Sequence, residues 1–253
     1  MARKSPPILV FQHTPTEPLG RLEESLRSEG AELHVYHHGY HEPPTADVTR
    51  AFGAIVSLGG PMSANDHATD PFLAGELEVM RKALSEDTAI LGISLGAHLL
   101  ALALGGTVLP LEGGPEIGWD AITLSPKAKL DPLIKGFGPT ETVFHWHRET
   151  VTVPRDARPL ASSKRCPAQA FAYGGAYLGL QFHVQADARM ADGWASAPEA
   201  AEDLRAAKTD LATISDSSLR HGGRATALAK VIGKRFALMA AGLRADQSGA
   251  IRI

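Results

Sequence analysis

Short apolar runs alternate with amphipathic stretches up to about residue 107 of the chain. Four runs are short and apolar enough to form buried strands: residues 8–12 (ILVFQ), 32–36, 53–58 (GAIVSL) and 89–93 (AILGI). Between them, apolar residues recur at helical spacing in two stripes, one at Leu19, Leu22 and Leu26 and the other at Leu73, Leu77, Met80 and Leu84. Strands that alternate with helices in this way predict right-handed βαβ units and a mostly parallel sheet, which is an α/β fold.

From about residue 107 the pattern changes to shorter strand-like pieces. They span residues 107–109, 121–124, 142–146, 169–173 and 177–183, and Gly174-Gly175 is expected to join the last two as a hairpin. After residue 187 the chain is Ala-rich and helical, with a loop expected over 211–223 and a final helix striped by Leu228, Ile232, Met239 and Leu243. We therefore expect one domain over residues 1–190 and a C-terminal helical extension over 191–253 packed on it.

Composition narrows the class of protein. The chain has 253 residues, 44% of them hydrophobic, which is enough for one sizeable core. Its formal charge of −3 gives no basic footprint for nucleic acid or an anionic membrane, and no apolar run approaches the roughly 18 residues of a membrane-spanning helix. Residues 1–7 lack the apolar region of a signal peptide. The single cysteine, Cys166, allows no internal disulfide, so we expect a cytoplasmic protein without nucleic-acid or membrane partners.

The strand over residues 89–93 ends in a motif that suggests chemistry. In parallel α/β sheets, ligands bind beyond the carboxyl ends of the strands. Here the strand runs into Gly92-Ile93-Ser94-Leu95-Gly96 and a helix follows, which is the G-x-S-x-G pattern of a nucleophile elbow. The glycines suit a sharp turn, and the helix N-terminus offers free N–H groups to a developing oxyanion. The plainer interpretation is a tight turn whose serine caps the helix.

Several separate motifs resemble class I glutamine amidotransferases. The segment 89–106 (AILGISLGAHLLALALGG) resembles their nucleophile segment, and 178–185 (LGLQFHVQ) resembles the block that holds their catalytic His and Glu. Leu58-Gly59-Gly60-Pro61 is similar to the glycine loop that supplies an oxyanion N–H. Further segments resemble the stand-alone, GMP-synthase-like branch: 116–119 (EIGW), 144–147 (FHWH), 166–171 (CPAQAF), and Phe11-Gln12-His13 with Glu17 and Gly20. The resemblance covers roughly residues 8–190 in collinear order.

This resemblance implies a flavodoxin-like three-layer sandwich and a site for a small amide or amino-acid-like ligand, which is glutamine in the family. Carried over residue by residue, the nucleophile falls on Ser94, the base on His183 and the orienting carboxylate on Gln185. The backbone N–H groups of Gly60 and Leu95 become the oxyanion donors. The substrate-binding positions fall on Gly59, His98, His145, Trp146 and His147. No cofactor and no metal is expected, and a partner protein is expected to supply any ammonia-accepting activity.

Three of these positions depart from the family's pattern. The family attacks glutamine with a cysteine thiolate, whereas the hydroxyl of Ser94 is far less acidic and depends fully on a neighbouring base. Gln185 can accept a hydrogen bond from His183, but it brings no negative charge to stabilise an imidazolium. Asp187 is a conceivable substitute for the missing carboxylate. His98 replaces a neutral amide with a bulkier ring, which should change what the pocket accepts.

Three functional interpretations remain open at this point. The first is an amidotransferase-family protein whose glutaminase chemistry is lost or strongly weakened. The second is a Ser-His hydrolase or amidase that uses the elbow at Ser94 on another substrate, and the third is an engineered Cys-to-Ser inactive form of an amidotransferase. A metal site made of His145, His147 and His183 is imaginable but lacks a spacing signature, and Cys166 is interpreted as a structural loop residue.

Overall fold

The computed structural model describes residues 7–242, so the expectations for the first six residues and for Leu243 lie outside the described part. The strands are β1 (Ile8–Gln12), β2 (Leu33–His37), β3 (Ala54–Ser57), β4 (Ala89–Ile93), β5 (Val108–Pro110), β6 (Glu116–Leu124), β7 (Thr140–His147), β8 (Glu149–Val151), β9 (Arg158–Ser162), β10 (Ala170–Tyr173) and β11 (Tyr177–Leu180). The α-helices are α1 (Arg21–Ser28), α2 (Pro71–Ser85), α3 (Leu95–Ala103), α4 (Ala188–Ser196), α5 (Ala201–Ala207) and α6 (Leu211–Ala240). Short 3₁₀ helices span Ala46–Ala51, Ala64–Ala68, Pro126–Leu130 and Pro198–Ala200.

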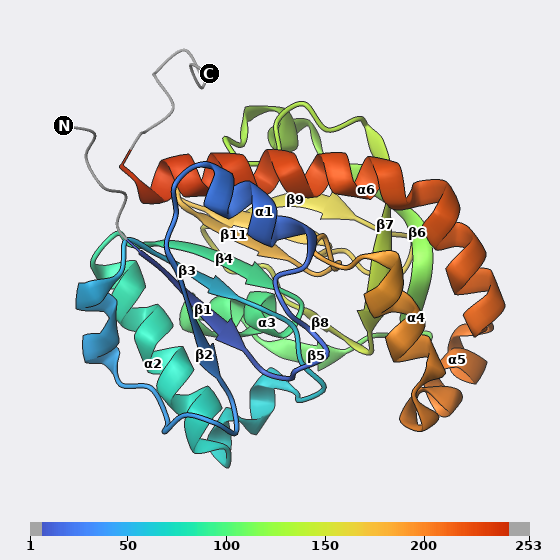
Figure 1. The fold of residues 1–253 in the computed structure, drawn as a ribbon, viewed down its shortest axis with the longest axis horizontal. Helices are drawn as coiled ribbons and strands as arrows, with labels where there is room; N and C mark the ends of the chain where they lie inside the picture. Colours follow the sequence, from blue (N-terminus) through green and yellow to red (C-terminus); the bar gives the residue numbers. More distant parts are fainter. Residues whose placement is uncertain (1–6, 243–253) are drawn as a thin grey trace.

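One large sheet organises the molecule, with strand order β2-β1-β3-β4-β11-β10-β9-β6-β7. Its first five strands in this order are parallel, with Ile8 of β1 paired to Leu33 on one side and to Ala54 on the other. The remaining pairs are antiparallel, and only β10 and β6 run against the common direction. The expected mostly parallel α/β sheet is therefore confirmed (Figure 1).

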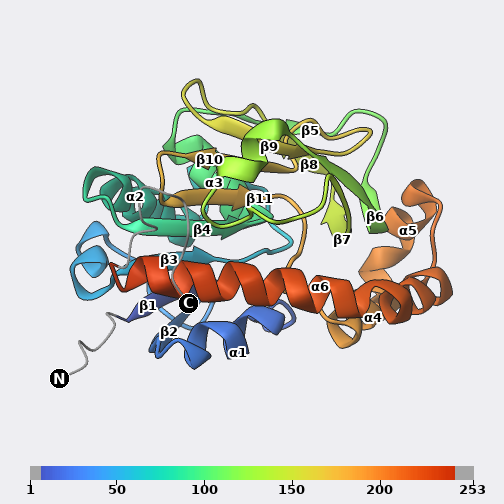
Figure 2. The same ribbon diagram turned by 90° about the horizontal axis from the view of Figure 1, so that it is seen from above.

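Both faces of the sheet are covered by helices, which produces three layers. Along β1, Ile8 and Val10 belong to a core shared with α1 and α6, whereas Leu9 and Phe11 belong to a second core shared with α2 and α3. Figure 2 shows these helix pairs on opposite sides of the sheet. Burial on both faces explains why the central strands are continuous apolar runs and do not alternate with polar residues. The flavodoxin-like sandwich expected from the resemblance is the fold of this chain.

The antiparallel part contains the expected hairpin and two strands that the sequence pattern did not predict. Gly174 adopts a φ of 54° between β10 and β11, whose pairing ends with Tyr173 opposite Tyr177. The two strands that were missed are β8 and β9; β8 pairs with β5 in a separate two-stranded sheet. Both are short and bounded by polar residues, so they carry too few apolar positions to show a period.

The loop expected over residues 211–223 is wrong, because these residues form the first half of α6. Asp210 caps this helix by accepting a hydrogen bond from the Thr213 N–H at 2.8 Å. Ile214 and Ser218 are then buried one turn apart, and the Trp119 indole donates to Ser218 Oγ at 2.8 Å. The polar composition indicated a loop, but a narrow buried stripe against β6 and α4 is sufficient to hold a helix.

The C-terminal helices gather at one end of the sheet (Figure 1). Helices α4 and α5 lie beside the start of α6, and the rest of α6 runs back along the face that also carries α1. No helix within residues 7–242 has both the length and the apolar character needed to cross a bilayer.

Two glycines within α6 provide a matched test of this correction. A methyl group at Gly223 would meet no atom within 4 Å, whereas one at Gly233 would collide with Ser25 Oγ and come within 3.0 Å of Ser25 Cβ on α1. We expect Gly223→Ala to raise the free energy of unfolding by about 0.5–1 kcal/mol, because alanine favours helix. Gly233→Ala should instead lower it by about 1–3 kcal/mol through overpacking. Urea unfolding followed by circular dichroism measures both; a stabilising Gly233→Ala would contradict the close packing of α1 on α6.

Candidate functional site

Ser94 occupies a strained turn between β4 and α3. Its backbone has φ 52° and ψ −110°, a positive φ that residues other than glycine rarely adopt. The side chain makes no capping hydrogen bond to α3, so the plainer interpretation of Ser94 as a helix cap is not supported. The hydroxyl lies at the carboxyl end of the sheet, next to the first turn of a helix, and it has no capping bond within the part of the chain that the structure describes.

The two glycines of the motif are required because α3 begins directly against the ends of the strands. A Cβ at Gly92 would press on the Gly96 carbonyl and lie 2.8 Å from the Ala97 nitrogen. A Cβ at Gly96 would collide with the backbone of Ser57 at the end of β3. A larger residue at either position would push the helix away from the sheet and relax the turn that carries Ser94.

The backbone N–H groups of Gly60 and Leu95 lie beside Ser94, and no backbone hydrogen bond within residues 7–242 uses them. The Gly96 N–H bonds to the Leu58 carbonyl at 3.1 Å, but the N–H of Leu95, the first helical residue, has no intrahelical partner. Gly60 comes so close that a Cβ on it would lie 3.0 Å from Leu95 Cδ2. Gly60, Ser94 and Leu95 line one cavity, so both predicted oxyanion donors lie at the same opening as the serine.

His183 lies just after β11 and is held by three groups. Its backbone N–H bonds to the Phe144 carbonyl at 2.8 Å, its Nε2 faces the Trp146 carbonyl at 3.4 Å, and its Nδ1 lies 3.1 Å from Gln185 Nε2. An amide N–H donates to Nδ1 in this arrangement, so the ring proton is on Nε2 and points to the Trp146 carbonyl. Rotating the Gln185 amide by half a turn would place its Oε1, which is buried without a partner in residues 7–242, against His183 Nδ1. The ring proton would then lie on Nδ1, and His183 Nε2 would be free to accept a proton.

The environment of His183 disfavours a charged ring. Burial lowers the pKa of His183 to about 3, and the hydrogen bond to the Trp146 carbonyl offsets only part of this effect. His183 is therefore neutral at physiological pH, and any mechanism that protonates it needs a counter-charge within reach.

Glu17 brings a carboxylate to His183, and the sequence interpretation gave it no role beyond its place in a matching segment. Its Oε2 lies 4.0 Å from His183 Nδ1 and has no hydrogen-bond partner. Burial raises the pKa of Glu17 to about 7, with the nearby His13 offsetting part of the shift. Gly59 makes this approach possible, because a Cβ there would collide with the Glu17 carboxylate and lie 2.9 Å from His183 Cε1.

Asp187, in contrast, is not available to His183. Its carboxylate caps α4 by accepting from the Met190 N–H at 2.8 Å. Helix α4 contributes a different residue, Trp194, whose ring centroid lies 4.9 Å from that of His183. The Trp194 indole also donates to the Thr16 carbonyl at 3.0 Å, which fixes the loop that carries Glu17. Sequence reasoning missed Trp194 because nothing in the local pattern around it points to the strand ends.

A buried ion pair between His13 and Glu76 supports the glycine loop at residues 58–61. His13 Nε2 lies 2.7 Å from a Glu76 oxygen, Ser57 Oγ donates to the other at 2.6 Å, and His13 Nδ1 lies 3.2 Å from the Gly59 carbonyl. Both ring nitrogens of His13 thus face acceptors, which requires the doubly protonated cation. Burial opposes this charge, but Glu76 outweighs it and raises the pKa of His13.

A cavity of about 640 Å³ opens over these groups, a size suited to a small-molecule ligand. Its lining includes most of the predicted site residues: Gly60, Ser94, Leu95, His98, Trp146, His147 and His183. Gly59, His145 and Gln185 are absent from the lining and lie behind it. Residues from α4 and α5 close one side, where Asp203 forms an ion pair with Arg148.

His98 is held as a neutral ring at the cavity wall. Its Nε2 donates to Gln181 Oε1 at 2.7 Å, and its Nδ1 lies 3.8 Å from a Glu149 oxygen. Burial lowers the pKa of His98 to about 4, so the ring offers the cavity an uncharged group at physiological pH.

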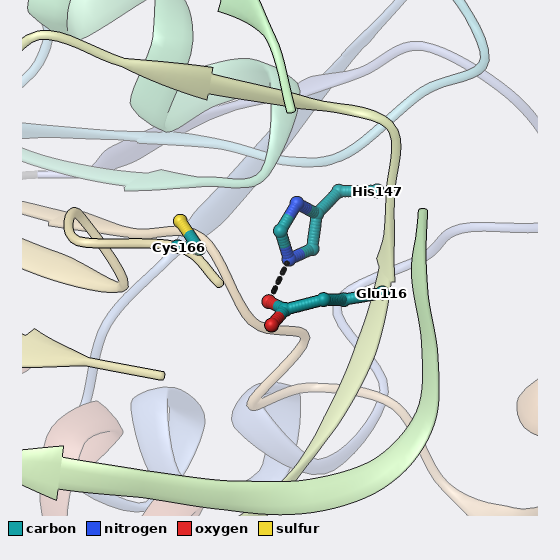
Figure 3. A group of neighbouring side chains, drawn as sticks. All are labelled: Glu116, His147 and Cys166. Atoms are coloured by element: carbon teal, nitrogen blue, oxygen red, sulfur yellow. Dashed lines mark ion pairs between the residues drawn. The ribbon is translucent and has the colours of Figure 1, made fainter. Parts of the chain in front are cut away.

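Behind the cavity, three of the matching motifs converge. Glu116 at the start of β6, His147 at the end of β7 and Cys166 in the loop before β10 offer ligand atoms that lie within 4.8 Å of one another (Figure 3). Burial alone would raise the pKa of Glu116, but hydrogen bonds from His147 and Ser163 lower it to about 2. His145, also a predicted site residue, lies next to this cluster, with Nδ1 3.9 Å from Glu116 Oε2.

The sequence of this chain is similar to those of known glutamine amidotransferases. The sequence profile of the family "Glutamine amidotransferase class-I" matches residues 20–192. The glutamine amidotransferase-like protein YfeJ of Salmonella typhimurium is 33% identical over 154 residues, which is 60% of this chain but only 63% of that protein. One subunit of the glutamine-hydrolyzing GMP synthase of Ignicoccus hospitalis is 31% identical over 58% of this chain and 72% of its own length.

Solved structures extend the similarity over most of the chain. A glutamine amidotransferase of Methylobacillus flagellatus superposes with a TM-score of 0.83 at 28% identity, covering 91% of this chain and 94% of that one. One from Thermotoga maritima gives a TM-score of 0.79 at 26% identity, covering 93% and 99%. Because the family profile matches well over half of the residues, Ser94, His183 and Gln185 among them, the chain belongs to the class I glutamine amidotransferase family.

Proposed function

We propose that this protein is a class I amidotransferase-like protein that binds a glutamine-like amide in its cavity, with glutamine hydrolysis lost or strongly weakened. In this proposal Ser94, His183 and Gln185 occupy the positions of nucleophile, base and orienting carboxylate. The observation that carries it is the contact between Gln185 and Nδ1 of a buried, neutral His183.

Glutamine hydrolysis is expected to be weak because the site does not stabilise the positive charge that the reaction creates on His183. A serine hydroxyl must transfer its proton to His183 as it attacks, which creates an imidazolium in a site that holds the pKa of His183 near 3. Gln185 supplies a dipole and no charge. In serine proteases, the equivalent acid-to-amide change costs about 10⁴ in turnover. The uncommitted N–H groups of Gly60 and Leu95 are unaffected by these changes, so ligand binding is compatible with the loss of catalysis.

Any use of ammonia would require a second protein. Some relatives are named as one subunit of GMP synthase, which implies that they work with another chain. We infer that this protein likewise docks with a partner that carries an acceptor activity.

One observation favours the serine-hydrolase alternative. Glu17 brings a carboxylate to 4.0 Å from His183 Nδ1, and above its raised pKa of about 7 it would be ionised and could stabilise the imidazolium that Gln185 cannot. The hydroxyl of Ser94, free of a capping bond, would then be the nucleophile on a substrate other than glutamine.

A restoration series tests the proposed degenerate triad. We expect the parent to release ammonia from glutamine at the background level set by Ser94→Ala. Ser94→Cys alone should restore little, and Ser94→Cys with Gln185→Glu should be at least about 100-fold more active, because residues of one catalytic unit are strongly non-additive. Adding His98→Gln should chiefly lower the KM for glutamine, because it rebuilds a binding contact. Full activity from Ser94→Cys alone would make the engineered Cys-to-Ser interpretation the best one.

The raised pKa of Glu17 predicts a pH-dependent stability. The folded state holds this proton more tightly than the unfolded state, with a pKa of about 7 against an ordinary value of 4.5, so stability falls as pH rises through this window. The stability of Glu17→Gln relative to that of the parent should therefore increase between pH 4.5 and 8, by up to roughly 3 kcal/mol. Urea midpoints across this range measure the difference. Glu23→Gln, in an exposed pair on α1, is the control and should run parallel to the parent; a parallel Glu17→Gln profile would refute the shift.

A fluorophosphonate probe separates the two candidate functions. Under the main proposal Ser94 is not activated, so the probe should label the protein no faster than it labels Ser94→Ala. If labelling rises above pH 7 and disappears in Ser94→Ala and in Glu17→Gln, the hydrolase alternative replaces the main proposal. Intact-protein mass spectrometry over pH 5–9 gives the readout.

A further inference from the structure

The cluster behind the cavity is built from residue types that bind transition metals. Cys166, His147 and Glu116 are 0%, 5% and 6% exposed, and their offered ligand atoms lie within 4.8 Å of one another (Figure 3). They come from β6, β7 and the loop between β9 and β10, which are far apart in the sequence and converge only in the fold.

The contacts of His147 call for a positive charge between its Nε2 and Glu116, either a second ring proton or a metal ion. Its Nδ1 lies 2.9 Å from the Glu149 carbonyl, which can only accept, so Nδ1 carries the proton. Nε2 lies 3.1 Å from the Glu116 carboxylate and 3.4 Å from Gln169 Nε2, so the hydrogen bond that His147 gives to Glu116 needs a second proton on the ring. In a neutral ring the Nε2 lone pair would face the carboxylate. Two acceptors at this distance repel unless a proton or a metal ion lies between them. An outer bond from one ring nitrogen to a carbonyl is also how metal-binding histidines are usually oriented.

His145 provides a second, independent indication. Its ring is 1% exposed, and Nε2 lies 3.4 Å from the Asp120 carbonyl, which assigns the proton to Nε2. The remaining nitrogen, Nδ1, is buried without any hydrogen-bond partner and lies 3.9 Å from Glu116 Oε2. An orphaned buried acceptor is costly and needs a partner of positive charge or a donor.

The surroundings also have an excess of acceptors. Gln169 donates to Glu116 Oε2 at 2.7 Å, but its own Oε1 is buried without a partner. Ser163 Oγ donates to Glu116 Oε1 at 2.6 Å, which orients the carboxylate. The Arg165 Nε stays 3.7 Å from Glu116 Oε1 and does not reach His145 or His147 by any ion pair or hydrogen bond in residues 7–242. A cation bound between the rings and the carboxylate would satisfy the unpaired nitrogen.

We propose that this cluster binds one Zn²⁺-type divalent transition-metal ion through His147 Nε2, the Glu116 carboxylate and Cys166 Sγ. His145 Nδ1, 3.9 Å from Glu116 Oε2 but outside that group of three, would take the fourth position after its ring moves. Nitrogen, sulfur and oxygen donors in a set of four are the ligands that Zn²⁺ takes in closed structural sites. Tetrahedral bonds of about 2.0–2.3 Å place ligand atoms about 3.3–3.8 Å apart, so shifts of about 1 Å would bring the ligand atoms of Glu116, His147 and Cys166 to these distances. Binding would release the thiol proton of Cys166 to solvent and leave the metal, thiolate and carboxylate with no net charge.

Such an ion would stabilise the wall of the cavity. His147 lines the cavity, whereas Glu116 and Cys166 lie behind it, so the metal would tie the ends of β6 and β7 to the loop before β10. It would also fix the orientation of His147. The inference does not rest on the state of Ser94, because metal content is measured independently of any reaction.

The test uses the full chain with any affinity tag removed. Metal-free protein, prepared with a chelator, is titrated with Co²⁺ and then with Zn²⁺. We expect one equivalent of Co²⁺ per chain with a thiolate-to-cobalt charge-transfer absorption, displaced by Zn²⁺. Cys166→Ser should abolish that absorption and weaken Zn²⁺ binding at least tenfold, and Glu116→Gln should weaken it comparably. A stacked surface pair, His37 and His41, is the control for adventitious binding, and replacing both with alanine should change neither result.

The Co²⁺ and Zn²⁺ titrations of the parent can overturn the metal-site proposal. If the parent binds Co²⁺ without thiolate absorption, or binds less than about 0.1 equivalent of Zn²⁺ at micromolar concentrations, the cluster is held by a proton and not by a metal, and the proposal is overturned. The parent's own spectrum decides this, so the test holds even where a variant folds poorly. Binding that disappears in the His37/His41 variant would likewise contradict the proposed site.

Discussion

The closeness of α3 to the ends of β3 and β4 is the constraint on which the site depends. Glycine at positions 92 and 96 lets the helix start against the Ser57 backbone, and the turn between them forces Ser94 to a positive φ. The neighbouring strands clamp this turn from both sides, because Leu180 accepts from the Ser94 N–H and Leu58 from the Gly96 N–H. The glycine loop after β3 and the histidine segment after β11 are thereby brought beside Ser94, as the sheet order β3-β4-β11 requires.

Burial, more than charge pairing, governs the electrostatics around that turn. The pKa of His183 is driven down and that of Glu17 is driven up by the same removal from water, so each is pushed towards its neutral form. A charged His13–Glu76 pair survives nearby because both partners are fully paired. Under the proposed assignment, the proton relay of Ser94, His183 and Gln185 lacks a stable charged state.

The C-terminal helices cover the sheet and also contribute residues to the site. Trp194 of α4 packs on His183, and Asp203 of α5 forms an ion pair with Arg148 at the cavity edge. The long helix α6 then joins this end of the molecule to α1 on the far side of the sheet. The cavity is therefore lined by residues on both sides of the boundary expected near residue 190.

The sequence by itself determined the strands of the parallel half, the elbow at Ser94 and the hairpin at Gly174, because each depends on a local pattern of apolar residues and glycines. It could not show that residues 211–223 are helical, since their buried stripe is narrow and is buried only by packing against β6 and α4. Nor could it bring Glu17 to His183, or separate buried His145 from cavity-lining His147. Those outcomes depend on contacts between distant segments and on the depth of burial, which only tertiary packing decides.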